Sequence, residues 1–231
     1  MIVSHKHKFI FLKTRKTGST STELYLYPHC GDEDIVTPLT PTAFTKAVGH
    51  RAQHHLRRAF RLDPRPEIHK ALRLEGFKGV DFHDHIRAED VRAYVGETVW
   101  RSYYKFAFDR NIYDRQVSWF HYRTKKHWKK RKWPDFRSFL ETSPEARVDN
   151  FHIYTIGGAL AVDFIGRYET LDGDLAQVMD ALGLAPKTDL PRAKADTRPS
   201  DTGYRAYYDE ETRRLVESWY PGERALFGHE F

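Results

Sequence analysis

The sequence predicts an α/β fold in which a central, mostly parallel sheet is covered by helices on both faces. Short apolar segments at Phe9–Leu12, Tyr104–Phe108 and Val162–Ile165 are interpreted as strands. Each is followed by a segment compatible with a helix, and strands that alternate with helices are typical of a parallel sheet. With 231 residues, the chain fits a single domain over residues 1–231 that can bury a sizeable core.

Helices are expected where apolar residues recur at helical spacing or where a breaker marks an end. The stretch 88–103 shows this spacing most clearly. Gly183 is placed to end one helix, and Pro221 to stop another. The expected helices are Thr22–Tyr27, Thr45–Phe60, Ala88–Tyr103, Tyr113–Tyr122, a short one from about Asp135, Asp172–Leu182 and Glu210–Tyr220.

Composition narrows the class of protein. The 38 basic and 32 acidic residues leave a formal charge of +6, which favours anionic partners without naming one. Cys30 is the only cysteine, which excludes a scaffold held by intramolecular disulfides. The apolar run Phe9–Leu12 is too short for a signal peptide or a membrane helix. We therefore expect a cytoplasmic protein without a transmembrane segment.

Residues 13–21, with the sequence KTRKTGSTS, connect the first strand to a helix. Backbone N–H groups at the start of a helix converge on one point, where the helix dipole adds positive potential. Gly18 allows close approach to an anion, and the hydroxyl groups around it can donate further hydrogen bonds. The alternative is an ordinary strand-to-helix turn with Ser or Thr as the N-cap. Because Lys16 precedes Gly18, the Walker A order of a nucleoside-triphosphatase loop is absent.

The segment Phe9–Glu23 resembles the 5′-phosphosulfate loop of sulfotransferases that use 3′-phosphoadenosine 5′-phosphosulfate (PAPS). In that family the matching lysine contacts the bridging oxygen of the leaving group, and the small residues after it hold the 5′-phosphate. The resemblance implies a three-layer, P-loop-like fold, with PAPS as co-substrate and 3′-phosphoadenosine 5′-phosphate (PAP) as product. It assigns the leaving group to Lys16, and the 5′-phosphate to Lys16, Thr17, Gly18, Ser19, Thr20 and Ser21.

A second candidate phosphate site lies in residues 106–118, FAFDRNIYDRQVS. Arg110 follows a strand and can fork onto a phosphate, while Ser118 can add a hydroxyl group from a helix. The alternative is an arginine that forms a salt bridge with Asp109 or Asp114. The segment also resembles the 3′-phosphate motif of the same family, which assigns Arg110 and Ser118 to the 3′-phosphate of PAPS.

A hydroxyl acceptor must lose its proton during transfer, and a neutral imidazole is suited to accept it near pH 7. The run 85–118 resembles bacterial sulfotransferases and the heparan and uronyl 2-O-sulfotransferases, in which a His-x-His pair supplies the base. The resemblance assigns the base to His85, with His83 as a second member of the site. The alternative candidates are His50, His54 and His55.

Two basic segments remain open in interpretation. The tail 204–231 also resembles the family, in which a basic loop before it tends to close over the nucleotide. That resemblance makes Arg192, Lys194 and Arg198 candidate nucleotide ligands, although a solvated loop fits them as well. Between Arg123 and Trp133 lie seven basic residues, no acid and two tryptophans. This segment is either a solvated surface or a patch that receives an anionic glycan or lipid head group; no nucleic-acid-binding motif accompanies it.

The leading hypothesis is a direct, in-line transfer of a sulfuryl group from PAPS to an acceptor hydroxyl, in which the protein aligns the reactants. His85 removes the acceptor proton, Lys16 stabilises the leaving group, and no metal ion is expected. The acceptor can be a glycan, a glycolipid or a small metabolite. The alternatives are a small-molecule kinase that uses ATP and magnesium, and a non-catalytic module that binds polyanions.

Overall fold

The computed structural model describes the chain apart from residues 56–81, 128–131, 187–188 and 191–201. Its central sheet has the strand order β3-β1-β2-β4-β7. Three neighbouring strands, β2 (Phe9–Leu12), β4 (Tyr104–Asp109) and β7 (Phe164–Arg167), are parallel. Two short strands, β1 (Ile2–Ser4) and β3 (Ile35–Val36), add an antiparallel edge that the sequence did not predict.

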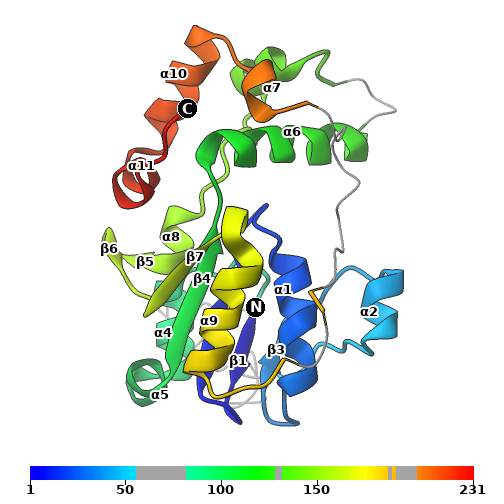
Figure 1. The fold of residues 1–231 in the computed structure, drawn as a ribbon, viewed down its shortest axis with the longest axis vertical. Helices are drawn as coiled ribbons and strands as arrows, with labels where there is room; N and C mark the ends of the chain where they lie inside the picture. The colour runs from blue at the N-terminus through cyan, green and yellow to red at the C-terminus, as the bar shows by residue number, and fades with distance from the viewer. Residues whose placement is uncertain (56–81, 128–131, 187–188, 191–201) are drawn as a thin grey trace, which may run out of the picture.

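Helices cover both faces of this sheet, as predicted (Figure 1). One face packs against α1 (Ser19–Leu26) and α9 (Leu171–Ala181) through the phenylalanines of β2 and β4. The other face packs against α4 (Ala88–Val95), α5 (Glu97–Ser102) and α8 (Phe151–Tyr154). Side chains alternate along each strand, so β2 sends Phe9 and Phe11 to the first layer and Ile10 and Leu12 to the second.

A helical cap lies beyond the carboxyl ends of the parallel strands (Figure 1). It consists of α6 (Ile112–His127), α7 (Phe136–Thr142), α10 (Glu210–Trp219) and α11 (Pro221–Phe227). An aromatic core of its own joins α6, α7 and α10. Asp135 caps α7 by accepting a hydrogen bond from the Ser138 amide. The loops after β2 and β4 therefore run between the sheet and this cap.

Several predicted boundaries shift for local reasons. The helix expected over 88–103 is two helices, because Gly96 adopts φ 81° between α4 and α5. Pro221 does stop α10, but it also begins α11, since proline is well tolerated in the first turn of a helix. The helix expected from Thr45 is the short α2 (Ala43–Ala47) within the described residues.

The remaining elements are short. They are the antiparallel pair β5 (Thr155–Ile156) and β6 (Ala159–Leu160), and the 3₁₀ turns η1 (Tyr27–His29), η3 (Tyr168–Thr170) and η5 (Tyr204–Tyr207). Within the part of the chain that the structure describes, no helix has the length and apolar character needed to cross a membrane.

Candidate active site

The loop that leaves β2 is tied to the neighbouring strand β4. The Thr14 hydroxyl donates to the Phe108 carbonyl and contacts the Thr17 hydroxyl at 2.8 Å. Asn150 holds the next residue from both sides, since its Oδ1 accepts from the Arg15 amide at 2.8 Å and its Nδ2 donates to the Arg15 carbonyl at 3.0 Å. The loop is thus fixed before it reaches α1. Asn150 lies about 135 residues away along the chain, and no local sequence signal identifies it.

The residues assigned to the 5′-phosphate lie at the amino end of α1. Thr17 is buried, Gly18 is the N-cap, and the next three residues, Ser19, Thr20 and Ser21, form the first turn. No side chain caps this helix, so its first amides have no side-chain acceptor at the N-cap. Lys16 and Gly18 both adopt left-handed φ values, 65° and 70°. A left-handed lysine is unusual, and such strain concentrates in binding loops.

Gly18 has a structural role as well. A Cβ atom there would lie 2.9 Å from Leu171 Cδ2 and 3.2 Å from the Tyr168 ring. The close packing of this glycine against α9 and η3 therefore leaves no room for a side chain. The left-handed φ is a second, independent reason for glycine at this position.

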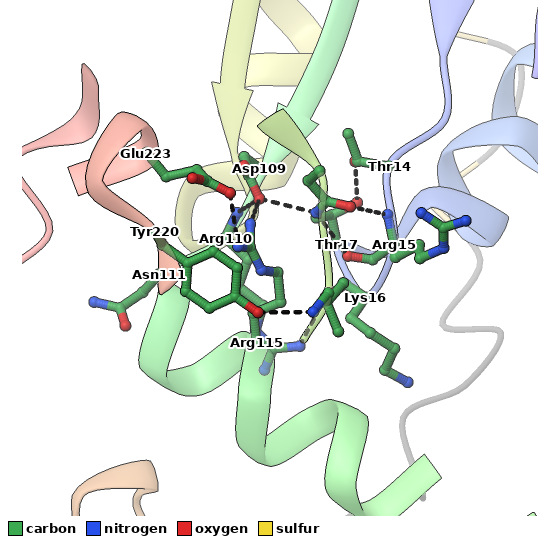
Figure 2. Close-up of polar contacts among 12 residues, drawn as sticks. Thr14, Arg15, Lys16, Thr17, Asp109, Arg110, Asn111, Arg115, Tyr220 and Glu223 are labelled. Atoms are coloured by element: carbon green, nitrogen blue, oxygen red, sulfur yellow. Dashed lines mark hydrogen bonds and ion pairs between the residues drawn. The ribbon is translucent and has the colours of Figure 1, made fainter. Parts of the chain in front are cut away.

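Arg110 and Lys16, the leading residues of the two predicted phosphate sites, lie next to each other (Figure 2). Arg110 Nη1 donates to the Lys16 carbonyl at 3.2 Å, although the two residues are separated by 94 positions. The guanidinium also lies 4.0 Å from the centre of the Tyr168 ring. Its Nε and Nη2 atoms donate to Asp114 at 2.9 and 2.6 Å. Arg110 thus forms a salt bridge with Asp114, one of the two acids considered from the sequence, and not with Asp109.

Asp109, the last residue of β4, belongs to a separate, buried cluster. Its carboxylate accepts hydrogen bonds from Arg115 at 2.7 Å, Asn150 at 3.1 Å and Tyr154 at 2.7 Å. Arg115 also pairs with Glu223 of α11 at 3.0 Å. Both Arg115 and Asp109 side chains are 0% exposed. Burial alone would lower the pKa of Arg115, but the two carboxylates raise it above its usual value, so the arginine stays charged.

His85 lies against the loop after β2. Its Nδ1 atom is 2.9 Å from the Lys13 carbonyl oxygen. Because a carbonyl oxygen only accepts, Nδ1 carries the proton, and Nε2 keeps its lone pair. Burial lowers the pKa of His85 to about 3, and the positive charges of Arg15 and Lys13 act in the same direction. At neutral pH this side chain is therefore an uncharged imidazole with a free acceptor nitrogen.

The loop that carries His85 is held by a buried ion cluster that the sequence analysis missed. Lys13 Nζ lies 2.8 Å from Glu23 of α1 and 3.0 Å from Asp84. Asp84 also accepts a hydrogen bond from the Thr37 hydroxyl at 2.9 Å. Burial alone would raise the pKa of Glu23, but the Met1 ammonium and Lys13 hold it at about 2. Lys13 thus positions His85 with its backbone and Asp84 with its side chain.

The other candidate histidines have different surroundings. His83 is exposed, and its Nδ1 accepts from the His85 amide at 3.3 Å. His50 packs on Tyr27 and lies 3.6 Å from Glu23. His54 Nε2 bonds to the Asp32 carbonyl, and the His55 carbonyl accepts from the Phe82 amide.

The basic segments are only partly described. Ser118 is buried on α6, two turns beyond Arg110. Arg192, Lys194 and Arg198 lie outside the described residues. Trp133 is 5% exposed and packs against Phe139 of α7, so its indole belongs to the core of the cap and is not available to an acceptor. Among the described residues there is no group of three or more His, Cys, Asp or Glu arranged to hold a metal ion.

Comparison with known proteins identifies the family of this chain. An uncharacterized protein of Archaeoglobus fulgidus is 34% identical over 103 residues, which are 43% of this chain and 84% of that protein. No solved structure gives a significant match. The profile of the Sulfotransferase family matches residues 1–230. Because that match spans nearly the whole chain, the protein belongs to the Sulfotransferase family.

Proposed function

We propose that this protein transfers a sulfuryl group from PAPS to an acceptor hydroxyl. The observation that carries the proposal is the 3.2 Å hydrogen bond between Arg110 Nη1 and the Lys16 carbonyl. Two segments assigned to opposite ends of one nucleotide meet there, at the carboxyl ends of β2 and β4. The crevice outside the carboxyl ends of parallel strands is where open α/β sheets bind ligands.

The loop after β2 fits a 5′-phosphate. The first turn of α1 has no side-chain cap, and a phosphate at this end would accept from its amides and gain from the helix dipole. The left-handed Lys16 and Gly18 on either side of Thr17 bend the backbone towards such a concave donor site. We describe the fold as P-loop-like on this basis.

The 3′-phosphate is assigned to Arg110 and Ser118. Arg110 is already oriented by Tyr168 and Asp114, which lowers the ordering cost of a bidentate contact. Asp109 does not compete for this guanidinium, because its carboxylate is occupied by Arg115, Asn150 and Tyr154.

When bound, PAPS supplies the sulfuryl group and a phosphate leaving group. Lys16 and the loop amides stabilise the negative charge that develops on that phosphate. His85 Nε2 takes the proton of the acceptor hydroxyl, while Nδ1–H stays bonded to the Lys13 carbonyl. His83, adjacent and exposed, is the secondary member on the acceptor side. The transfer is a single in-line step without a covalent enzyme intermediate.

The competing kinase hypothesis needs an acid after a strand to hold magnesium. Asp109 ends β4, but its carboxylate already accepts hydrogen bonds from three side chains. The kinase is therefore less favoured than the sulfotransferase. A polyanion-binding module is the other alternative, and it predicts binding without transfer.

A nucleotide competition experiment separates these functions. The full chain is titrated calorimetrically with PAP, ATP plus magnesium, and AMP, and is then incubated with radiolabelled PAPS and cell extract. We expect PAP to bind more tightly than ATP, and label to appear in products heavier by one sulfuryl group. Preference for ATP, or PAP binding without any label transfer, would contradict the proposal.

A further inference from the structure

A hollow of about 340 Å³ lies beside the candidate transfer site, outside the residues assigned to the nucleotide. It is formed by the end of the loop after β2, the outer side of α6 and the segment that precedes α8. Its lining residues are Arg15, Trp119, Glu145, Arg147, Val148 and Asp149.

Basic residues outnumber acids around this hollow. Of its two lining acids, Glu145 pairs with Arg123, and Asp149 bonds to the His152 imidazole at 2.7 Å and also attracts Arg15. With Arg123 included, three arginines stand against two carboxylates. The two lining arginines, Arg15 and Arg147, form no ion pair with any other residue that the structure describes. Two arginines thus line one concave surface, which favours an anionic ligand.

Arg15 is held in place rather than extended into solvent. Its amide is bonded to Asn150, and its Nη1 donates to the Asp149 carbonyl at 3.3 Å. Trp119 forms the opposite wall, where its Nε1 donates to the Glu145 carbonyl at 2.7 Å. The cavity walls are therefore ordered before a ligand arrives, which reduces the entropic cost of binding.

The hollow adjoins the atoms that the proposed reaction uses. Arg15 directly precedes Lys16 and comes two residues after Lys13, whose carbonyl oxygen lies 2.9 Å from His85 Nδ1. Trp119 stacks on Tyr122 with ring centres 5.3 Å apart, and Lys16 Nζ lies 4.6 Å from the Tyr122 ring centre. A molecule seated in the hollow therefore lies beside the loop that carries Lys16 and that is bonded to His85.

We propose that this hollow is an acceptor subsite in which Arg15 and Arg147 bind an anionic group, a carboxylate or a phosphate, of the hydroxyl-bearing substrate. The inference rests on the proposed function and deepens it, because it restricts the acceptor to negatively charged compounds. It also places acceptor selection on residues 15 and 147 and not on the indole of Trp133.

The test uses the full chain saturated with PAP and three probes: methyl β-D-glucoside, methyl β-D-glucuronide and glucose 6-phosphate. The sugars share ring hydroxyl groups and differ in the charge at C6, and the two charged probes distinguish a carboxylate from a phosphate. Their affinities are measured by saturation-transfer NMR titration. We expect a charged probe to bind about tenfold more tightly than the glucoside, the usual effect of one charged hydrogen bond.

Arg147→Gln is the decisive variant, because Arg147 is exposed and its loss does not disturb the core. It should abolish most of the preference for the charged probe while PAP affinity stays unchanged. Arg214→Gln on α10, also exposed, removes the same charge far from the hollow and should leave the preference intact.

The outcomes separate the two proposals. If PAP binds but the probes bind equally or not at all, or if Arg147→Gln behaves like Arg214→Gln, the subsite is wrong while the nucleotide assignment stands. If PAP itself does not bind, the proposed function fails and the subsite fails with it.

Discussion

Two groups of charged residues meet at the carboxyl ends of β2 and β4, and they differ in how completely protein surrounds them. The closed cluster is Asp109, Arg115 and Glu223, in which the arginine is 0% exposed and bonded to both carboxylates. The open cluster is Lys16, Arg110 and His85, whose members reach the protein surface. Arg110 and Arg115 are five positions apart in one segment. Arg115 is fully buried and stabilises the fold, whereas Arg110 is partly exposed and can bind a ligand.

The largest expected effect comes from the open cluster, through His85→Asn. Removing a general base commonly costs about 10²–10⁴-fold in rate. We expect kcat to fall by that amount while calorimetric PAP affinity stays unchanged, because the proposal places His85 on the acceptor side and not at the nucleotide. His54→Asn, which alters a histidine whose Nε2 bonds to the Asp32 carbonyl, is the control. Full turnover in His85→Asn would refute the assignment of the base.

The closed cluster is tested by Arg115→Met. This change leaves Asp109 and Glu223 buried without their cation, and breaking a buried pair from one side costs about 3–5 kcal/mol. The free energy of unfolding, measured in urea, should fall by this amount. Arg213→Met on α10 removes an arginine from a partly exposed pair and should cost about 1 kcal/mol or less. Equal losses in the two variants would show that the closed cluster is not a stabilising element.

Arg110→Met tests the residue of the open cluster that is assigned to the 3′-phosphate. Losing a charged, bidentate phosphate contact should weaken PAP binding by about 10- to 100-fold. AMP lacks the 3′-phosphate, so its affinity should not change. The ratio of the PAP and AMP dissociation constants, measured by calorimetry, reports this directly. If both nucleotides weaken equally, Arg110 supports the Lys16 loop instead of contacting the 3′-phosphate.

The contrast between the clusters also explains what the sequence could predict. The strand, the glycine and the hydroxyl groups of the loop after β2 are contiguous in the sequence. The order of strand, loop and helix around Lys16–Ser21 could therefore be predicted. The helices on both faces of the sheet also followed from local spacing. The antiparallel edge strand β1 was missed because three residues give too little periodicity to recognise.

Contacts between distant segments were not predictable in the same way. Asn150 and Glu223 join the site from 135 and 108 positions away, and nothing in their own neighbourhoods marks them. Asp109 was a candidate salt-bridge partner of Arg110, whereas the fold directs its carboxylate to Arg115. Lys13 was assigned no role beyond its place at the start of the loop, although its carbonyl sets the tautomer of His85.

The smallest expected effect is a pH dependence of the free energy of unfolding, which arises from His85 in the open cluster. Folding lowers the pKa of His85 from 6.5 to about 3, chiefly by burial. Below pH 6.5 the unfolded chain takes up a proton at His85 that the folded protein does not. The stability contributed by the neutral imidazole is therefore fully present above pH 6.5 and declines as the pH falls towards 3. Each pH unit in this interval costs at most about 1.4 kcal/mol.

Urea unfolding at about pH 7.5 and about pH 5.5 should thus show a loss about 1 kcal/mol larger in the wild type than in His85→Asn, which cannot take up this proton. The same low pKa predicts that kcat/KM has no acid inflection near 6.5, because His85 remains a neutral base throughout this range. An identical pH-dependent loss in both proteins would mean that His85 titrates normally and is solvated in the folded state. Its bond to Lys13 would then not hold the tautomer on which the proposed base depends.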